Sequence, residues 1–235
     1  MIGAMVGTVD HVLYAAIAFV GLHLLLSGTP LRGLLAGALG EKAFSAAFSL
    51  VGIVTLVWLV LAYRAAPTEI IWATAPWARY LPLVVMPVAL MLAVYGLSTP
   101  NPTFIGMAGR AKAKDPAPGI LKITRHPFLW GVVLWALAHI TVNGDSKSLI
   151  LFGAMAVLAL AGMLAIDAKR EKSLGAAWGR LALTTSVIPF LAAAQGRTKI
   201  VWGEMSLKWA AVALVLYVVL VGGHIFFFGV TALPM

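Results

Sequence analysis

Long apolar stretches separated by short polar segments dominate this sequence. A helix needs about 20 residues to cross a hydrocarbon core of ~30 Å, and six stretches meet or nearly meet that length. They cover residues 9–28, 44–63, 81–98, 127–143, 148–166 and 209–230. The pattern predicts an all-α, polytopic integral membrane bundle of six transmembrane helices, in one transmembrane domain over residues 1–235.

Two further segments are predicted not to span. The run 181–194 is shorter than the others and contains two threonines, a serine and Pro189. Irregular backbone at membrane depth needs protein or water around it, so we expect a re-entrant or interfacial segment there. The loop 99–122 cannot form a continuous helix, because it contains Pro100, Pro102, Pro116 and Pro118.

Composition supports the membrane interpretation and excludes some chemistry. Of the 235 residues, 62% are hydrophobic and 11% are charged, and the mean hydropathy is +0.99. A soluble domain could not keep that much apolar surface away from water. The chain has no cysteine, which excludes disulfides, thiolate metal sites and cysteine nucleophiles.

The distribution of basic residues predicts the topology. The net charge is +9, which in a soluble domain would suggest nucleic acid, but here the basic residues lie in short loops between apolar runs. With six spans and an outer N-terminus, fourteen Lys and Arg lie inside and three outside. A seventh span would weaken this to eleven against six. The positive-inside rule therefore favours six spans with both termini periplasmic, in a bacterial inner (plasma) membrane. The expected partner is the lipid bilayer, and no nucleic acid is expected.

Two histidines in the fourth run belong to different places. His126 and His139 are 13 residues apart, which on a helix is about 140° of rotation and roughly 20 Å of rise. They cannot bind one metal ion from one face. Arg125 and His126 precede Pro127 and form a cationic corner suited to a carboxylate, a phosphate or a haem propionate. The same pattern is also typical of a helix start whose side chains reach the headgroups.

Other histidines lie within the apolar runs, and neutral imidazole is a good ligand for haem iron. His139 shares a face with small Ala136 and with Trp135, which could pack against a macrocycle edge. His23 and His224 also lie on apolar helices. A lone intramembrane histidine more often bonds a backbone carbonyl than a cofactor. By depth, His139 and His224 fall in the outer half and His23 towards the inner side.

Acidic residues and soluble-enzyme motifs add little chemistry. Asp167 is expected to form an interfacial ion pair near Lys169 and Arg170, and Asp145 to serve a structural turn. His11 is expected to form an interfacial polar pair with Asp10. The sequence has no GxSxG, HExxH or phosphate-loop motif.

Several segments together resemble one family from about residue 9 to 232. They are "FVGLHLLLSGTPLRG", "TPNPT", "GILKITRHPFLWGVVLWALAHITVNGD", "LAIDAKR", "TSVIPF" and "GGHIFFFG". Their order is that of the NnrU family of bacterial membrane proteins, whose name comes from genes clustered with denitrification and nitric oxide metabolism. The family is similar to the 15-cis-ζ-carotene isomerases, which use a b-type haem to isomerise a polyene double bond.

This resemblance implies haem b, with His23 and His139 as axial ligands of the iron, and a cis-trans isomerase acting on a lipophilic polyene. It leaves the role of His126 open. Two departures are visible. The isomerases carry a cysteine three residues before the second ligand, where this chain has Ala136. Near the C-terminus this chain reads His224-Ile225 where the isomerases have an element of the His-Pro type. Because His139 and His224 have similar depths, His224 is the rival ligand.

Two alternatives stay open. The RHP segment followed by a basic loop also resembles isoprenylcysteine carboxyl methyltransferases, which bind S-adenosylmethionine, although only Glu171 stands where those enzymes have a glutamate pair. The third reading is a non-catalytic haem sensor or accessory subunit for nitric oxide respiration. A lipophilic substrate would enter laterally from the bilayer, and a homo-oligomer is compatible with each reading.

Overall fold

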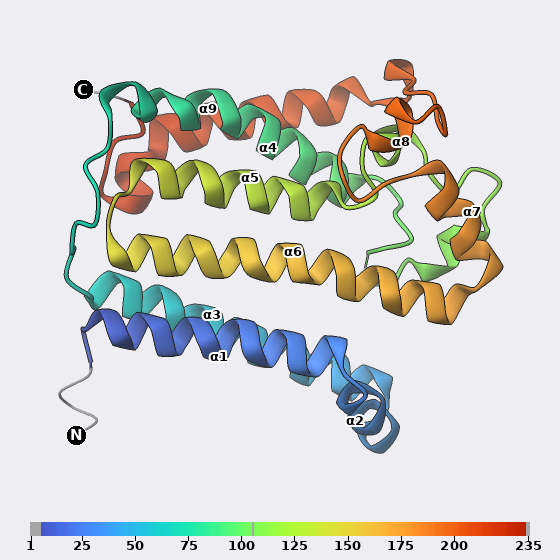
Figure 1. Cartoon of the computed structure of the whole chain (residues 1–235), viewed down its shortest axis with the longest axis horizontal. Helices are drawn as coiled ribbons and strands as arrows, with labels where there is room; N and C mark the ends of the chain where they lie inside the picture. Colours follow the sequence, from blue (N-terminus) through green and yellow to red (C-terminus); the bar gives the residue numbers. More distant parts are fainter. Residues whose placement is uncertain (1–5, 105, 234–235) are drawn as a thin grey trace. The chain divides into compact units, whose positions relative to one another are not determined.

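The described part of the chain is helical. The computed structural model describes residues 6–104 and 106–233, and within these residues it contains helices and loops but no β-strand (Figure 1). The long helices are α1 (Val9–Gly28), α3 (Glu41–Ala65), α4 (Leu81–Ser98), α5 (Pro127–Val142), α6 (Ser146–Leu174) and α9 (Leu207–Phe228). The short ones are α2 (Leu31–Leu39), η2 (Pro76–Tyr80), η3 (Ala108–Lys112), η4 (Gly119–Lys122), α7 (Ala176–Thr184), α8 (Leu191–Ala194) and η5 (Trp202–Glu204).

Each of the six predicted spans is a helix, which confirms the all-α membrane bundle. Five are long and apolar enough to cross a bilayer, when η2 is joined to α4. The sixth, α5, is apolar but has 16 residues, fewer than the roughly 20 that a full span needs. It contains the buried residues Val133, Ala136 and Ala138. This burial is typical of a short core helix.

The polar ends of the helices differ from the sequence prediction. Helix α6 continues past residue 166 to Leu174 and carries three basic residues on its last turns. The nine-residue helix α2 was not predicted. The run 181–194 does not form one helix, because α7 ends at Thr184 and α8 begins at Leu191. Phe190 between them has a left-handed backbone with φ of 65°. The described backbone therefore bends there instead of spanning, as predicted.

The helix flanks are as apolar as the core. Leu207 is 86% exposed and Phe226 is 87% exposed, and Trp77 and Leu34 are each 72% exposed. On α9 the buried residue is Ala213. Side chains of this kind need an apolar solvent, so lipid, not water, suits these flanks.

The chain forms two compact units, and each draws on both halves of the sequence. Unit 1 contains residues 1–79 and 136–162, and unit 2 contains 80–135 and 163–235. The unit boundaries fall within α5 and α6. That the whole chain forms one domain stays a prediction.

Unit 1 is built on α1 and α3, which lie side by side (Figure 1). Its core includes Val12, Phe19 and Leu59, with partly buried residues of α6 packed against them. The Tyr63 and Ser148 hydroxyls are hydrogen-bonded at 3.1 Å. That contact holds the C-terminal end of α3 against the N-terminal end of α6.

Unit 2 is built on α4 and α9, with the first part of α5 close to α4. Gly131 of α5 is required by this approach, because a Cβ there would lie 2.6 Å from the carbonyl oxygen of Ala89. Small residues allow such close backbone packing in membranes. The Tyr217 hydroxyl also donates to the Leu83 carbonyl at 3.0 Å, which ties α9 to α4.

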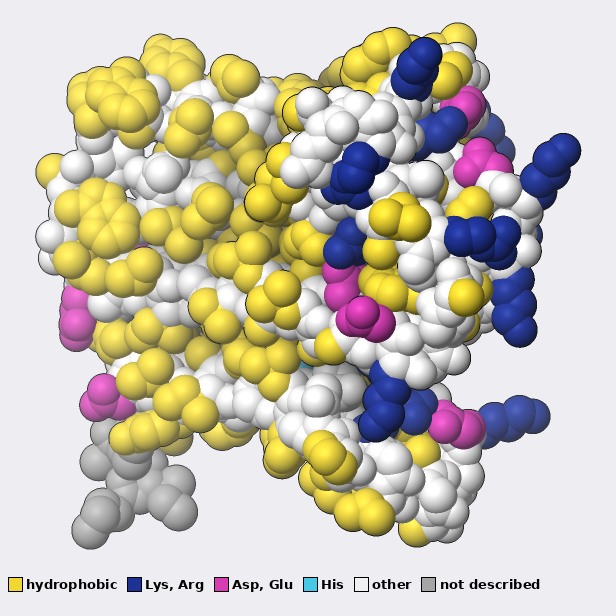
Figure 2. All heavy atoms as spheres, turned by 45° about the vertical axis from the view of Figure 1, so that its right-hand side comes forward, with side chains coloured by type: hydrophobic (Ala, Val, Ile, Leu, Met, Phe, Trp, Pro, Cys, Tyr) yellow, Lys and Arg dark blue, Asp and Glu magenta, His cyan; other side chains and the backbone are white. Residues whose placement is uncertain are grey.

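Charge is gathered at one end of unit 2. Its twelve Lys and Arg residues lie after α4, around the end of α6, on α7, and from residue 197 to the first turn of α9, together with four acidic residues. Figure 2 shows dark blue side chains gathered over α7 and the neighbouring loops, while the helix flanks are mainly hydrophobic. This asymmetry agrees with the positive-inside pattern expected for these loops.

Candidate functional site

The start of α5 carries a buried ion-pair network in unit 2. Asp167 of α6 accepts from Arg125 Nε at 2.8 Å and lies 2.7 Å from His126 Nε2. The His126 side chain is 1% exposed, and those of Arg125 and Asp167 are 14% and 15% exposed. Pro127 then opens α5, where its missing N–H costs nothing. One carboxylate therefore contacts both the Arg125 guanidinium and the His126 imidazole.

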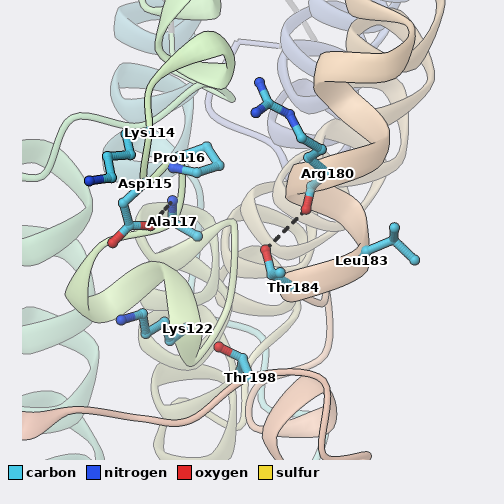
Figure 3. A pocket seen from close by; sticks show the side chains of 9 residues that line it. All are labelled: Lys114, Asp115, Pro116, Ala117, Lys122, Arg180, Leu183, Thr184 and Thr198. Carbon is cyan, nitrogen blue, oxygen red and sulfur yellow. Dashed lines mark hydrogen bonds between the residues drawn. The ribbon is translucent and has the colours of Figure 1, made fainter.

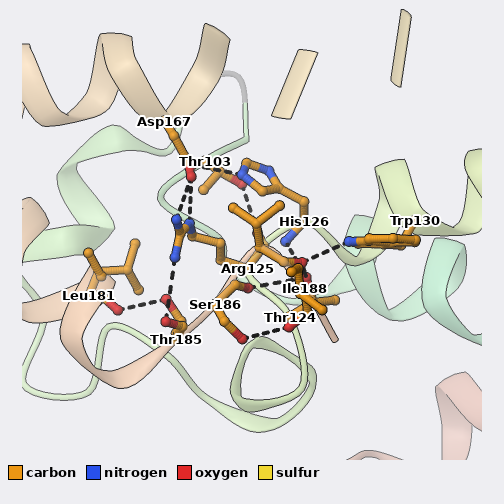
Figure 4. Close-up of polar contacts among 12 residues, drawn as sticks. Thr103, Thr124, Arg125, His126, Trp130, Asp167, Leu181, Thr185, Ser186 and Ile188 are labelled. Carbon is orange, nitrogen blue, oxygen red and sulfur yellow. Dashed lines mark hydrogen bonds and ion pairs between the residues drawn. The ribbon is translucent and has the colours of Figure 1, made fainter. Parts of the chain in front are cut away.

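Two distant loops close around Arg125. Its N–H donates to the Ser186 carbonyl at 3.0 Å. Its own carbonyl accepts from Asn101 Nδ2 and Thr103 Oγ1, both at 3.1 Å. The Thr124 hydroxyl donates to Val187 at 2.7 Å. We define these residues as the RHP cluster (Figure 4): Asn101, Thr103, Thr124, Arg125, His126, Asp167, Thr185, Ser186 and Val187.

Cations cap the loop that follows α7. Arg125 lies over the Trp178 ring, with Cζ 5.5 Å from its centroid. Arg197 donates from one guanidinium nitrogen to the carbonyls of Ala182, Leu183 and Thr185 at 2.7–3.0 Å. Carbonyls at a helix C-terminus lack intrahelical partners, so a guanidinium suits them. The bend before α8 is thus held by side chains instead of by a continuing helix.

The cationic corner predicted at Arg125 and His126 already faces a carboxylate of its own chain. The expected ion pair of Asp167 is present, and its partners are these two residues. Binding of a haem propionate there stays a prediction. The sequence predicted a cationic corner without a counter-charge. The structure instead pairs Arg125 and His126 with the Asp167 carboxylate, which supplies the opposite charge that a buried guanidinium needs.

His23 lies in unit 1 in a different kind of environment. Its Nδ1 is 3.1 Å from the Phe19 carbonyl oxygen. A carbonyl can only accept, so Nδ1 carries the proton and Nε2 keeps a lone pair. The ring meets Phe19 and Phe48 edge-on, at centroid distances of 4.8 and 5.2 Å. Among the described residues, Nε2 has no hydrogen-bond partner in the structure.

Gly52 of α3 makes room for that imidazole. A Cβ at this position would lie 3.0 Å from Cε1 and 3.3 Å from Nε2 of His23. Iron would bond to Nε2, and a backbone carbonyl on the other nitrogen is the usual means of fixing a ligating tautomer. Helix α3 lies close to Nε2, so ligation of haem iron by His23 stays a prediction.

His139 also lies in unit 1, in the last turn of α5. Its ring is tilted against Phe152 of α6, with centroids 5.0 Å apart. By the ~1.5 Å rise per residue, Phe152 lies about 9 Å from the start of α6, and His23 about 21 Å from the start of α1. Helices α1 and α6 begin at the same end of unit 1. The two histidines therefore differ by about 12 Å in their distance from that end, measured along the helices. Joint ligation by this pair stays a prediction.

The remaining predicted residues each have surroundings of their own. Trp135 is on α5, one turn before His139, and is half-buried. His224 is half-buried on α9 in unit 2, with Nδ1 2.8 Å from the Val230 carbonyl oxygen. His11 was expected to pair with Asp10, but its Nε2 accepts from Trp58 Nε1 at 2.8 Å. Among the described residues, no three His, Cys, Asp or Glu side chains gather as a metal-binding group.

Comparison with known proteins places this arrangement in a family. The family model described as NnrU protein matches residues 11–232, which is nearly the whole chain. The chain belongs to the NnrU family. A maize (Zea mays) protein named 15-cis-zeta-carotene isomerase, chloroplastic, is 37% identical over 82 residues. That match covers 35% of this chain and 22% of the maize protein. No solved structure matches.

The structure gives physical roles to the motifs on which the NnrU resemblance rests. Asn101 and Thr103 come from "TPNPT", Asp167 from "LAIDAKR", and Thr185 and Ser186 from "TSVIPF", and all of them meet Arg125 or its neighbours. Sequence reasoning did not bring these segments together. The available signal was Asp167, an acidic residue at the end of an apolar run that needs a buried cation.

The glutamate required by the methyltransferase alternative is in an open position. Glu171 lies on the last turns of α6 and is exposed. No second glutamate stands beside it in the sequence. The structure adds no observation in favour of that alternative.

Proposed function

We propose that this NnrU protein binds haem b in unit 1 through His23 and catalyses cis-trans isomerisation of a double bond in a lipophilic polyene. The observation that carries the proposal is the His23 imidazole, whose Nδ1 proton is directed to Phe19 while Nε2 keeps its lone pair beside Gly52. The partial likeness to a protein named as a carotene isomerase supports the substrate class. His139 is the proposed second ligand, and His224 is the rival that would replace His23 as its partner.

The chain's own residues would act by binding and by excluding water. When bound, haem supplies a redox-active iron centre that can interact with a polarisable double bond. The Phe19 carbonyl keeps the His23 ring in one orientation, and Phe19 and Phe48 shield it. Isomerisation neither adds nor removes atoms, and it leaves the oxidation state of the polyene unchanged. Ala136, in place of a cysteine, leaves nitrogen ligands as the available ones on α5.

Substrate access and location follow from the apolar flanks. A polyene dissolved in lipid would reach the helices laterally, without crossing water. We place the chain in a bacterial plasma membrane with both termini periplasmic, since the basic loops of unit 2 would then face the cytoplasm. A connection with nitric oxide metabolism rests on the family resemblance.

Absorption spectra of the detergent-purified chain, oxidised and reduced, test haem binding. A Soret band is expected in the wild type, and His23→Ala should lose or shift it. His139→Ala should also lose or shift it, and the same loss in His224→Ala but not in His23→Ala would favour the His139 and His224 pair. His11→Ala is the matched control on α1, because Trp58 already occupies its Nε2. A folded wild type without a Soret band, even after haem reconstitution, defeats the proposal.

Activity is tested separately with the haem-loaded, reduced protein and a cis polyene in the detergent. Appearance of the trans isomer, followed by chromatography and absorption, is expected for the wild type but not for His23→Ala. Haem binding with no isomerisation of any polyene would leave the sensor or accessory role as the better reading.

A further inference from the structure

A cavity of about 410 Å³ opens at the basic end of unit 2. It lies between the loop around Lys114–Lys122 and helix α7, as Figure 3 shows. Pro116, Ala117 and Leu183 are the apolar residues of its lining. Leu183 is 68% exposed, so an apolar surface is left open among charged residues. None of these residues belongs to the surroundings of His23.

Three cationic side chains border the cavity. Lys122 already pairs with Glu204. Lys114 and Arg180 are exposed, and within the described residues their side chains make no ion pair or hydrogen bond. In Figure 3 the Lys114 ammonium and the Arg180 guanidinium project away from the centre. The positive charge therefore lies at the rim of the cavity, and Pro116, Ala117 and Leu183 form the apolar part of its lining.

Hydroxyl groups complete the lining. Thr198 is half-buried, and no partner of its hydroxyl is found within the described residues. Thr184 donates to the Arg180 carbonyl at 3.1 Å, and its oxygen keeps acceptor capacity. Such groups suit the ester and glycerol oxygens of an amphiphile. Asp115 accepts from the Ala117 N–H at 3.1 Å, so one carboxylate oxygen is used within the loop.

We propose that this cavity binds the anionic phosphodiester headgroup of a membrane phospholipid. The exposed Lys114 and Arg180 side chains would contact the phosphate at the rim, and the glycerol and upper acyl carbons would cover Pro116, Ala117 and Leu183. A free phosphate ion would gain nothing from the apolar part of the lining. The place in the fold suits a lipid, because this end of unit 2 carries the membrane-boundary loops and its basic residues. The site is independent of haem binding.

The test uses full-length protein in a detergent with uncharged headgroups. Native mass spectrometry measures retention of phosphatidylglycerol and of phosphatidylcholine with the same acyl chains. One basic residue near an anionic lipid surface contributes about fivefold to binding, so Lys114→Gln/Arg180→Gln should weaken phosphatidylglycerol retention by about 10- to 25-fold. Lys112→Gln/Lys199→Gln removes the same charge from the same end but outside the cavity lining, and should change retention less than about twofold.

Two further variants separate the lipid from a free ion. Leu183→Asn should weaken phosphatidylglycerol retention, because it makes the apolar part of the lining more polar, and millimolar inorganic phosphate should not displace the lipid. Preference for phosphatidylglycerol together with these results supports the proposal. Equal retention of both lipids, equal loss in the two double variants, or displacement by phosphate with no effect of Leu183→Asn overturns it. The single variants Lys114→Gln and Arg180→Gln serve if the double variant fails to fold.

Discussion

His23 and His126 are both histidines within apolar surroundings, yet the chain treats them in opposite ways. His126 is almost fully buried, and its Nε2 faces the Asp167 carboxylate that Arg125 also uses. His23 has one polar contact, from Nδ1 to a carbonyl of its own helix, and aromatic rings on two sides. The first imidazole contacts a carboxylate within unit 2, whereas Nε2 of the second has no hydrogen-bond partner among the described residues.

The comparison shows why a motif can be prominent without being the reacting site. Arg125 and His126 are the polar residues that stand out most in the sequence. Their contacts join three other segments of unit 2, around Asn101, Asp167 and Ser186. A ligand needs an unshared lone pair in a fixed tautomer, and Nε2 of His23 has no hydrogen-bond partner among the described residues, whereas His126 Nε2 faces a carboxylate. Stability and cofactor binding should therefore separate when the two places are changed independently.

The largest effect on stability is expected for Asp167→Asn. Removing the charge leaves Arg125 partly buried without its counter-charge, which costs about 3 kcal/mol and lowers the apparent unfolding midpoint in detergent by about 6–12 °C. Asp115→Asn is the control, because that exposed side chain keeps an oxygen for the Ala117 N–H. Equal midpoints for Asp167→Asn and the wild type would contradict the role given to the cluster. The Soret band should remain in folded Asp167→Asn.

Gly52→Ala should have a smaller effect on stability and a larger one on the spectrum. The added Cβ would stand 3.0 Å from Cε1 of His23, so the ring must shift at a cost of about 1–2 kcal/mol. The Soret maximum is expected to move or weaken. Gly21→Ala on α1 is the matched control, since a Cβ there meets nothing within 4 Å. An unchanged spectrum in Gly52→Ala would place the iron elsewhere.

The smallest effect is expected at an exposed ion pair of unit 2. Glu204 accepts from Lys122 and from the Gly119 N–H. The Lys122 ammonium, followed by the Gly119 N–H, holds the pKa of Glu204 below its ordinary value of 4.5. A lowered folded-state pKa stabilises the protein above the ordinary value, and that contribution is lost as pH falls through the lowered one.

Glu204→Gln should therefore lower the stability by less than about 1 kcal/mol at neutral pH, because the pair is exposed and screened. The difference from the wild type should shrink as pH falls below about 4.5. Unfolding midpoints measured across acidic pH check this result. A difference that grows on acidification would contradict the assigned direction of the pKa.

Sequence reasoning was strongest for the long helices and weakest for the polar ends. The bounds of α1 and α4 agree with the predicted runs, because a lipid-facing helix must be apolar for its whole length. Helix α2 was missed, since nine residues with mixed polarity produce no spanning signal. The extension of α6 was missed because Lys169, Arg170 and Lys172 resemble a loop, although a helix can continue beyond the bilayer.

The candidate site divides in the same way. His23, His126 and His139 could be named from the sequence, because ionisable residues in apolar runs are costly and stand out. The links of Arg125 to Asn101, Asp167 and Ser186 could not be named, since they join segments far apart in the chain. The contact of Gly52 with His23 could not be predicted either, because a glycine can occur in a helix for many different reasons.

The amino-acid sequence by itself determined that this chain is an all-helical membrane protein with its charge concentrated between the apolar runs. The requirement that apolar backbone segments satisfy their own hydrogen bonds in lipid leaves little choice. Which histidine meets a carboxylate, and which one meets a carbonyl of its own helix, was decided by the tertiary structure. Such a difference depends on a carboxylate, a carbonyl or a missing Cβ arriving within about 3 Å, and only packing sets those distances.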